Sequence, residues 1–176
     1  QVDAMQTQVQ SYLSRARIAA QRESVLARTE AQPALERLVR VMRKLNPEKQ
    51  VHLSINPPGL VLAMELQDVE ETVGNLLENA ARHARAEVWL NVRPAPSEVH
   101  AKEPGRQWIV LDVDDDGPGL NPDQIAVAMK RGKRLDESKP GTGLGLSIVS
   151  EIVREYQGTI TLSRRDEGGL RAELVL

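Results

Sequence analysis

The 176-residue sequence contains no cysteine and no phenylalanine, and aromatic residues make up only 2% of it. Without cysteine there is no disulfide framework, cysteine-based zinc site, thiol nucleophile or iron–sulfur cluster. No uninterrupted apolar run is long enough to cross a bilayer, and no basic-then-apolar signal peptide opens the chain. The net charge is only −2, from 23 Lys+Arg and 25 Asp+Glu. This balance gives no electrostatic reason to expect a nucleic-acid partner.

The residues that are present describe an ordinary globular chain, 40% hydrophobic and 27% charged. The length allows one domain with a substantial core and a helical appendage. Because the chain begins at Gln1 and not at Met, we expect it to be a piece of a longer protein.

The first segment, residues 1–24, has no glycine or proline and is predicted to be helical. Its apolar residues are spaced 3, 4, 3, 4 and 3 positions apart, as in a coiled-coil seam: Val2, Met5, Val9, Tyr12, Ala16 and Ala19. One interpretation is an amphipathic helix that packs on its own domain. The other, modestly favoured, is a helix that pairs with a partner chain.

Hydrophobic periodicity and turn residues predict the remaining elements. Helices are expected at 33–45, from Asp68 to about 84, and at 144–156, and strands at 51–55, 86–93, 107–114, 159–164 and 171–176. Successive strands without intervening helices indicate a layered α/β sandwich with a mixed sheet. The stretch 115–145 lies between two glycine clusters and is expected to contain at most one short helix.

The helix after residue 68 carries a polar stripe opposite its apolar face. Asp68 with Glu71 predicts a capping box at its start. The stripe follows at helical spacing and consists of Asn75, Asn79, Arg82 and His83. A solvated face is the default interpretation. The alternative is a ligand site, because an amide oxygen suits Mg²⁺ and an Arg one turn later can meet a phosphate.

Asp115 continues the phase of the apolar residues in strand 107–114, so its carboxylate should project on the apolar side of the sheet. Such a carboxylate needs a donor, and a purine exocyclic amine is one. Gly117 and Gly119 would let a flat ring approach the backbone. The competing interpretation is an acidic tight turn.

A second glycine cluster, Gly141-Thr142-Gly143-Leu144-Gly145, runs directly into a helix. Free N–H groups at a helix N-terminus favour phosphate oxygens. Neither a P-loop nor a dinucleotide fingerprint fits it. The basic residues between the two clusters are either a solvated loop or a lid that meets a polyphosphate: Lys130, Arg131, Lys133, Arg134 and Lys139.

Each motif is weak alone, but their order and spacing are specific. Asn-x-x-x-Asn, Asp-x-Gly-x-Gly, a long lid and Gly-x-Gly-x-Gly together resemble the ATP-binding domain of sensor histidine kinases, within the superfamily of gyrase, Hsp90 and MutL. The resemblance covers roughly residues 50–176, and the lid sequence is similar to the PhoQ-type subgroup. It implies a Bergerat-type two-layer α/β sandwich with a mixed, largely antiparallel sheet, preceded by an N-terminal helix.

The resemblance also implies the domain organisation. Residues 1–24 would be the partial end of a dimerisation helix, 25–50 a linker and first helix, and 51–176 the catalytic domain with its lid at 117–143. The full-length protein would be a homodimer in the bacterial inner membrane with this domain in the cytoplasm. Its partners would be a response regulator and a dimerisation domain that carries the acceptor histidine.

Roles in the family's N box carry over by position. Asn79 matches the Mg²⁺-coordinating residue, and Asn75 lines the same site as a second possible ligand. Arg82 matches the basic residue that contacts phosphate, and Glu78 an acidic position discussed as a proton acceptor. His83 falls where a ring packs beside the nucleotide.

The glycine boxes carry over in the same way. Asp115 matches the adenine-binding aspartate, with Gly117 and Gly119 beside it. The second box would surround the phosphates, together with two lid cations: Gly141, Thr142, Gly143, Leu144, Gly145, Arg131 and Arg134.

Two features of the family are missing. Its F box normally has two Phe in the lid, and Ala128-Met129 stands near that place. The phosphoacceptor histidine is absent, because the only histidines are His52, His83 and His100.

We therefore expect a catalytic domain that binds MgATP and transfers its γ-phosphate to a histidine outside this chain. A water-activating ATPase of the gyrase type is a competing possibility, but it needs a Glu base where this chain has Asn75. An anti-sigma serine kinase and a nucleotide-binding module that only regulates a partner are two further possibilities.

Overall fold

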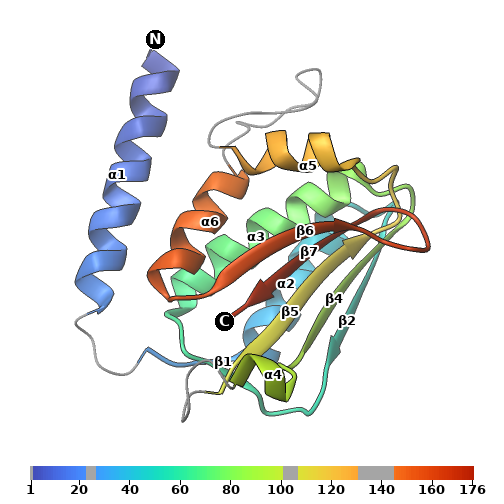
Figure 1. Ribbon diagram of the computed structural model, residues 1–176, viewed down its shortest axis with the longest axis horizontal. Helices are drawn as coiled ribbons and strands as arrows, with labels where there is room; N and C mark the ends of the chain where they lie inside the picture. Colours follow the sequence, from blue (N-terminus) through green and yellow to red (C-terminus); the bar gives the residue numbers. More distant parts are fainter. Residues whose placement is uncertain (1, 23–26, 101–106, 131–144) are drawn as a thin grey trace.

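The computed structural model describes residues 2–22, 27–100, 107–130 and 145–176 (Figure 1). Its helices are α1 (Val2–Arg22), α2 (Ala31–Leu45), α3 (Leu66–His83), α4 (Ser97–His100), α5 (Pro122–Met129) and α6 (Gly145–Glu155). Its strands are β1 (Thr29–Glu30), β2 (Gln50–Ile55), β3 (Val61–Leu62), β4 (Glu87–Pro94), β5 (Ile109–Asp115), β6 (Thr159–Arg164) and β7 (Leu170–Val175).

Five strands form one sheet in the order β2-β4-β5-β7-β6. β2 and β4 are parallel, and the other three pairings are antiparallel. Helices α2, α3 and α6 lie on one face of this sheet, which makes two layers (Figure 1). The predicted α/β sandwich with a mixed, largely antiparallel sheet is therefore confirmed.

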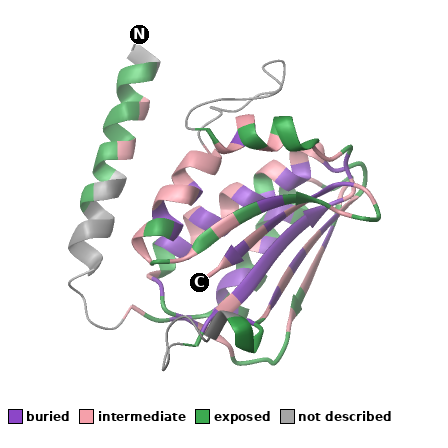
Figure 2. Cartoon of the chain, in the orientation of Figure 1, coloured by how far each residue is buried: buried purple, intermediate pink, exposed green. Residues whose placement is uncertain are grey.

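The core lies between the sheet and these helices. Val88, Leu90 and Val92 alternate along β4 on the helix-facing side, and all three are buried. The apolar stripe of α3 meets them, with Val73 and Leu77 among its buried residues. The central strand β5 is the most deeply buried one (Figure 2). Periodicity of 2 in the strands and 3.6 in the helix thus explains why both elements were predictable.

The start of α3 differs from the prediction. The helix begins at Leu66, and its N-cap residue Glu65 makes no side-chain capping bond. Asp68 lies inside the first turn, fully buried, and accepts a hydrogen bond from the Tyr156 hydroxyl. The predicted Asp68–Glu71 capping box is therefore wrong, because a tertiary partner just beyond α6 takes the Asp68 carboxylate away from the helix backbone.

Two short strands were not predicted. β1 and β3 pair as a separate two-stranded sheet, with Thr29 opposite Leu62. Each has two residues, which is too short for a period-2 pattern to be visible in the sequence.

Helix α1 stands beside α6 (Figure 1), and much of its described part is exposed (Figure 2). Met5, Val9 and Tyr12 are 67%, 54% and 74% exposed, whereas Ser11 donates a 3.5 Å hydrogen bond to Glu151 of α6. The interpretation that this seam packs on its own domain is therefore wrong for these three residues, and pairing with a partner stays a prediction. Within the described residues no helix is both long and apolar enough to span a membrane.

Candidate functional site

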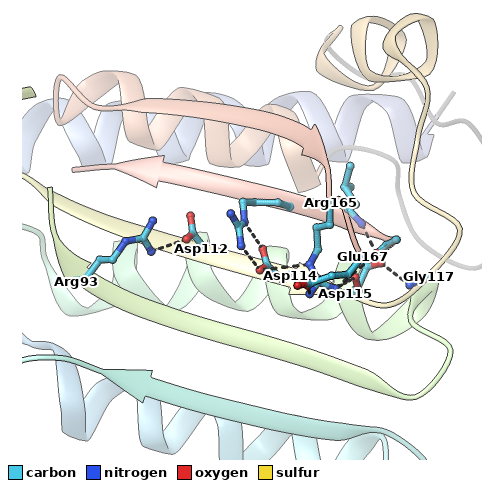
Figure 3. Close-up of polar contacts among 10 residues, drawn as sticks. Arg93, Asp112, Asp114, Asp115, Gly117, Arg165 and Glu167 are labelled. Carbon is cyan, nitrogen blue, oxygen red and sulfur yellow. Dashed lines mark hydrogen bonds and ion pairs between the residues drawn. The ribbon is translucent and has the colours of Figure 1, made fainter. Parts of the chain in front are cut away.

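The candidate site lies where β5 ends beside the last turn of α3. Asp115 closes β5, is only 3% exposed, and lies in the same strand phase as the core residues Leu111 and Val113, as expected. Its Oδ1 accepts hydrogen bonds from the backbone N–H of Gly117 at 2.8 Å and of Leu170 at 3.3 Å (Figure 3). The carboxylate is therefore fixed by one oxygen, from the turn after β5 and from the start of β7.

This environment opposes ionisation of Asp115. Burial raises the pKa of its carboxyl group, and the hydrogen bonds from Gly117 and Leu170 offset that effect only in part. The nearby His83 also favours the charged form, more weakly. A ligand that donates a hydrogen bond to the carboxylate would stabilise the charged form further.

Asp116 holds the neighbouring chain in place. Its Oδ1 accepts from the N–H groups of Arg85, Ala86 and Glu87 at 2.8 to 3.1 Å. Slight burial raises the pKa of Asp116, but these three backbone donors outweigh it and leave the pKa below the ordinary value. Asp116 therefore joins the end of β5 to the connection between α3 and β4.

The glycine turn packs directly on α3. A Cβ at Gly117 would overlap the backbone carbonyl oxygen of His83, so only glycine allows this approach. Nδ1 of His83 lies 2.9 Å from the Asn79 carbonyl oxygen, to which it can donate. The last turn of α3 and the turn after β5 thus form one surface.

The side-chain amides of Asn75 and Asn79, both in the polar stripe, differ in their hydrogen bonds. Asn75 donates from Nδ2 to the Glu71 carbonyl oxygen at 2.6 Å. Its Oδ1 lies close to the first residue of α6, 3.2 Å from where a Cβ of Gly145 would be. The side-chain amide of Asn79 makes no hydrogen bond to any residue that the structure describes. The stripe therefore borders the N-terminus of α6, where backbone N–H groups favour phosphate.

Arg82, a member of the stripe, pairs with an acidic residue beside it. Arg82 is half-buried and lies 3.4 Å from the Glu78 carboxylate, one helical turn away. Glu78 is exposed, with 66% of its side chain accessible. An exposed pair of this kind is weakly held, so the guanidinium can exchange Glu78 for a phosphate.

The side chains of the candidate site can be compared with the ligands that Mg²⁺ takes in proteins. No group of three or more acidic, His or Cys ligands occurs among the described residues. Mg²⁺ in phosphate-transfer sites is held by one or two protein ligands, waters and the substrate phosphates. The amide oxygen of Asn79 suits a site of this kind. The described residues do not offer the cluster of ligands that an all-protein Mg²⁺ site needs.

Part of the predicted site lies outside the described residues, namely Arg131, Arg134, Gly141, Thr142, Gly143 and Leu144. Within the expected lid at 117–143 the structure describes α5, whose N-cap Asn121 forms a capping box with Gln124. Ala128 is 8% exposed and joins the main core, with Met129 packed against it. Small and flexible apolar residues thus pack at 128–129, the stretch that the sequence resemblance places near the family's F box.

The β6–β7 turn is a part of the site that sequence reasoning missed. Gly119 has a φ of +70°, and a Cβ there would lie 2.9 Å from the Gly169 carbonyl oxygen. Gly169 has a φ of +97°, and a Cβ there would overlap the Asp115 carbonyl oxygen. In the sequence, the Gly168-Gly169 pair indicates a hairpin turn. Two adjacent glycines in this turn could have indicated that its backbone lies close to another segment of the chain.

Known proteins resemble this chain in sequence over most of its length. Residues 64–176 match the model of the family described as histidine kinase-, DNA gyrase B- and HSP90-like ATPases. The chain is 42% identical over 130 residues to the sensor protein kinase CarS of Pseudomonas aeruginosa, a match that covers 74% of this chain and 27% of that protein. It is 30% identical over 179 residues to the virulence sensor histidine kinase PhoQ of Salmonella typhimurium, covering 99% of this chain and 34% of PhoQ. The chain thus spans about a third or less of the length of these curated relatives.

Solved structures show the same fold. The mycobacterial sensor histidine kinase MprB superposes with a TM-score of 0.69 at 22% identity, covering 86% of this chain and 97% of that one. Full-length ShkA in complex with AMPPNP gives a TM-score of 0.70 at 20% identity, covering 98% of this chain and 35% of ShkA. With the family match across more than half of its length, this chain belongs to the histidine kinase-, gyrase B- and HSP90-like ATPase family, as a PhoQ-like ATP-binding domain of the sensor-kinase type.

Proposed function

We propose that this chain binds MgATP at the junction of β5, α3 and α6 and presents the γ-phosphate to a histidine on a dimerisation domain. The observation that carries the proposal is the buried Asp115 carboxylate, one oxygen of which accepts from the N–H groups of Gly117 and Leu170. Asp115 would accept a hydrogen bond from the adenine amine. Gly117 would support this contact by keeping the turn after β5 close to α3, because a Cβ there would overlap the His83 carbonyl oxygen.

The phosphates would extend from there toward the N-terminus of α6. Asn79, together with Asn75, would bind a metal ion or a phosphate, and Arg82 would contact a phosphate. When bound, Mg²⁺ would neutralise charge on the phosphate oxygens. The residues of this chain would contribute by positioning and by electrostatics, as is general in phosphoryl transfer. Glu78, one residue before Asn79, would be the candidate proton acceptor.

In this proposal the whole protein is a homodimeric kinase of the bacterial inner membrane, with this domain in the cytoplasm and a response regulator as its partner. The exposed apolar seam of α1 supports pairing with another helix. In this proposal the acceptor histidine lies outside this chain, because none of the three histidines of the chain lies on its first helix.

The test compares the chain alone with the chain plus a separate dimerisation domain, each incubated with MgATP labelled at the γ-phosphate. We expect no histidine phosphorylation of the chain alone and transfer to the added domain. Binding without any transfer would favour a purely regulatory module. ATP hydrolysis abolished by Asn75→Ala would favour a water-activating ATPase, although an amide cannot accept a proton.

A further inference from the structure

On the open face of the sheet, opposite the helices, Arg165 follows directly after β6. Its side chain is only 11% exposed. Nη1 donates to the Asp115 carbonyl oxygen at 2.9 Å and to the Gly168 carbonyl oxygen at 3.2 Å. Nη2 donates to Glu167 at 2.8 Å (Figure 3). One guanidinium thus holds both the end of β5 and the turn that leads into β7.

We propose that Arg165 is a positioning residue for base recognition, which fixes the main chain of Asp115 from the open face so that its carboxylate meets the nucleotide on the helix-facing side. This inference rests on the proposed function, in which Asp115 contacts the base. The Arg165 side chain makes no hydrogen bond to the Asp115 carboxylate itself and reaches it only through backbone groups, namely the carbonyl oxygens of Asp115 and Gly168.

The carbonyl group of Asp115 contacts two parts of the β6–β7 turn, the Arg165 side chain and the Gly169 backbone. Arg165 binds its carbonyl oxygen, and the Gly169 backbone lies against the same carbonyl so closely that a side chain would not fit. On the other side of the strand, the Leu170 N–H binds the carboxylate. If the Arg165 bond is removed, the turn loses one of the contacts that orient Leu170 toward the carboxylate.

The guanidinium is itself held by two neighbours on the open face. Its central carbon lies 4.6 Å from the centre of the Trp89 ring, and its Nε lies 3.6 Å from Asp114. Trp89 in turn stacks on His52, with ring centres 5.8 Å apart. A planar, delocalised cation with forked donors suits this place, because it stacks on an indole and donates to two carbonyls at once. A lysine ammonium group carries the same charge but has no planar group to stack on the indole.

Arg171 provides a matched control. It binds the same Asp114 with two hydrogen bonds of 2.9 and 2.8 Å, and its neighbour on β5 is Asp114, not Asp115. Arg165 and Arg171 therefore carry the same charge on the same face and share one carboxylate. They differ in that only Arg165 binds the Asp115 main chain.

The experiment compares wild type with Arg165→Gln, Arg165→Lys and Arg171→Gln. Calorimetry with non-hydrolysable ATP and GTP analogues gives the ratio of the two affinities, and thermal unfolding confirms that each variant is folded. We expect Arg165→Gln to lower the preference for the ATP analogue by about tenfold, the effect of one misplaced charged hydrogen bond. Arg165→Lys should fall between Arg165→Gln and wild type, and Arg171→Gln should keep the wild-type ratio.

A second readout does not require nucleotide. In NMR spectra of the nucleotide-free chain, Arg165→Gln should shift the amide signals of Gly117 and Leu170, the two donors to the Asp115 carboxylate, and Arg171→Gln should leave Gly117 unchanged. An unchanged affinity ratio in folded Arg165→Gln or Arg165→Lys, or an equal loss in Arg171→Gln, would overturn the proposal. If wild type binds neither analogue, the proposed function fails instead, and the amide shifts alone decide whether Arg165 orients Asp115.

Discussion

The Tyr156 hydroxyl donates a 2.6 Å hydrogen bond to the Asp68 carboxylate and also accepts one from the Glu65 N–H at 3.3 Å. Tyr156 follows the end of α6, and Asp68 lies in the first turn of α3. Burial of Tyr156 raises the pKa of its hydroxyl above the ordinary value, and the hydrogen bond to Asp68 raises it further. The two helices that border the candidate site are thus joined at the ends remote from it.

Tyr156→Phe removes this hydroxyl and leaves the buried Asp68 carboxylate without that donor. We expect the free energy of unfolding to fall by about 1–3 kcal/mol, the usual effect of losing a hydrogen bond to a buried charged group. Denaturant unfolding measures it. Tyr12, the only other tyrosine, is 74% exposed on α1, so Tyr12→Phe is the matched control and should change stability by less than about 0.5 kcal/mol. Equal stability of Tyr156→Phe and wild type would show that Asp68 does not depend on this bond.

Asp115→Asn should keep the fold and lose the preference for adenine. An amide oxygen can still accept from Gly117 and Leu170, but it lacks the charge that strengthens a bond to the adenine amine. The ratio of affinities for ATP and GTP analogues should drop by roughly 10- to 100-fold, measured by calorimetry. Asp123→Asn, at an exposed position on α5, is the control. A retained preference in Asp115→Asn would place the base elsewhere.

The same substitution makes a prediction about pH. Burial raises the folded-state pKa of Asp115 above its unfolded value, so the folded chain holds the proton more tightly. Wild type therefore loses stability as the pH rises through the unfolded pKa of about 3.9 and then through the folded pKa. Asp115→Asn has no such proton, so its stability relative to wild type should increase over this range and become constant at higher pH. Denaturant unfolding at a series of pH values checks this, and a difference independent of pH would contradict it.

Asn79→Ala should weaken Mg²⁺-dependent nucleotide binding and spare binding in the presence of a chelator. The reason is that the Asn79 amide has no partner among the described residues and is the candidate metal ligand. Calorimetry with a non-hydrolysable ATP analogue, with and without Mg²⁺, separates the two contributions. Asn91→Ala, on the open face of β4, should affect neither, and an equal loss in both conditions for Asn79→Ala would argue against a metal role.

Much of the fold was predictable because its signals are local. The alternation in β4 and β5 predicted which residues face the helices, and Asp115 was placed correctly by continuing the phase of Val113. The order of the glycine and asparagine motifs indicated the family before any geometry was known. The assignment of Asp68 as a cap failed because a capping pattern cannot show that a carboxylate has a stronger partner elsewhere.

Local patterns in the sequence are thus enough to indicate the family, the layers and the position of Asp115 at the end of a buried strand. The tertiary structure decided how that carboxylate is held. Arg165 is 50 residues from Asp115, and Tyr156 is 88 residues from Asp68. Contacts at such separations arise only when the sheet and its helices assemble, and no local period in the sequence encodes them.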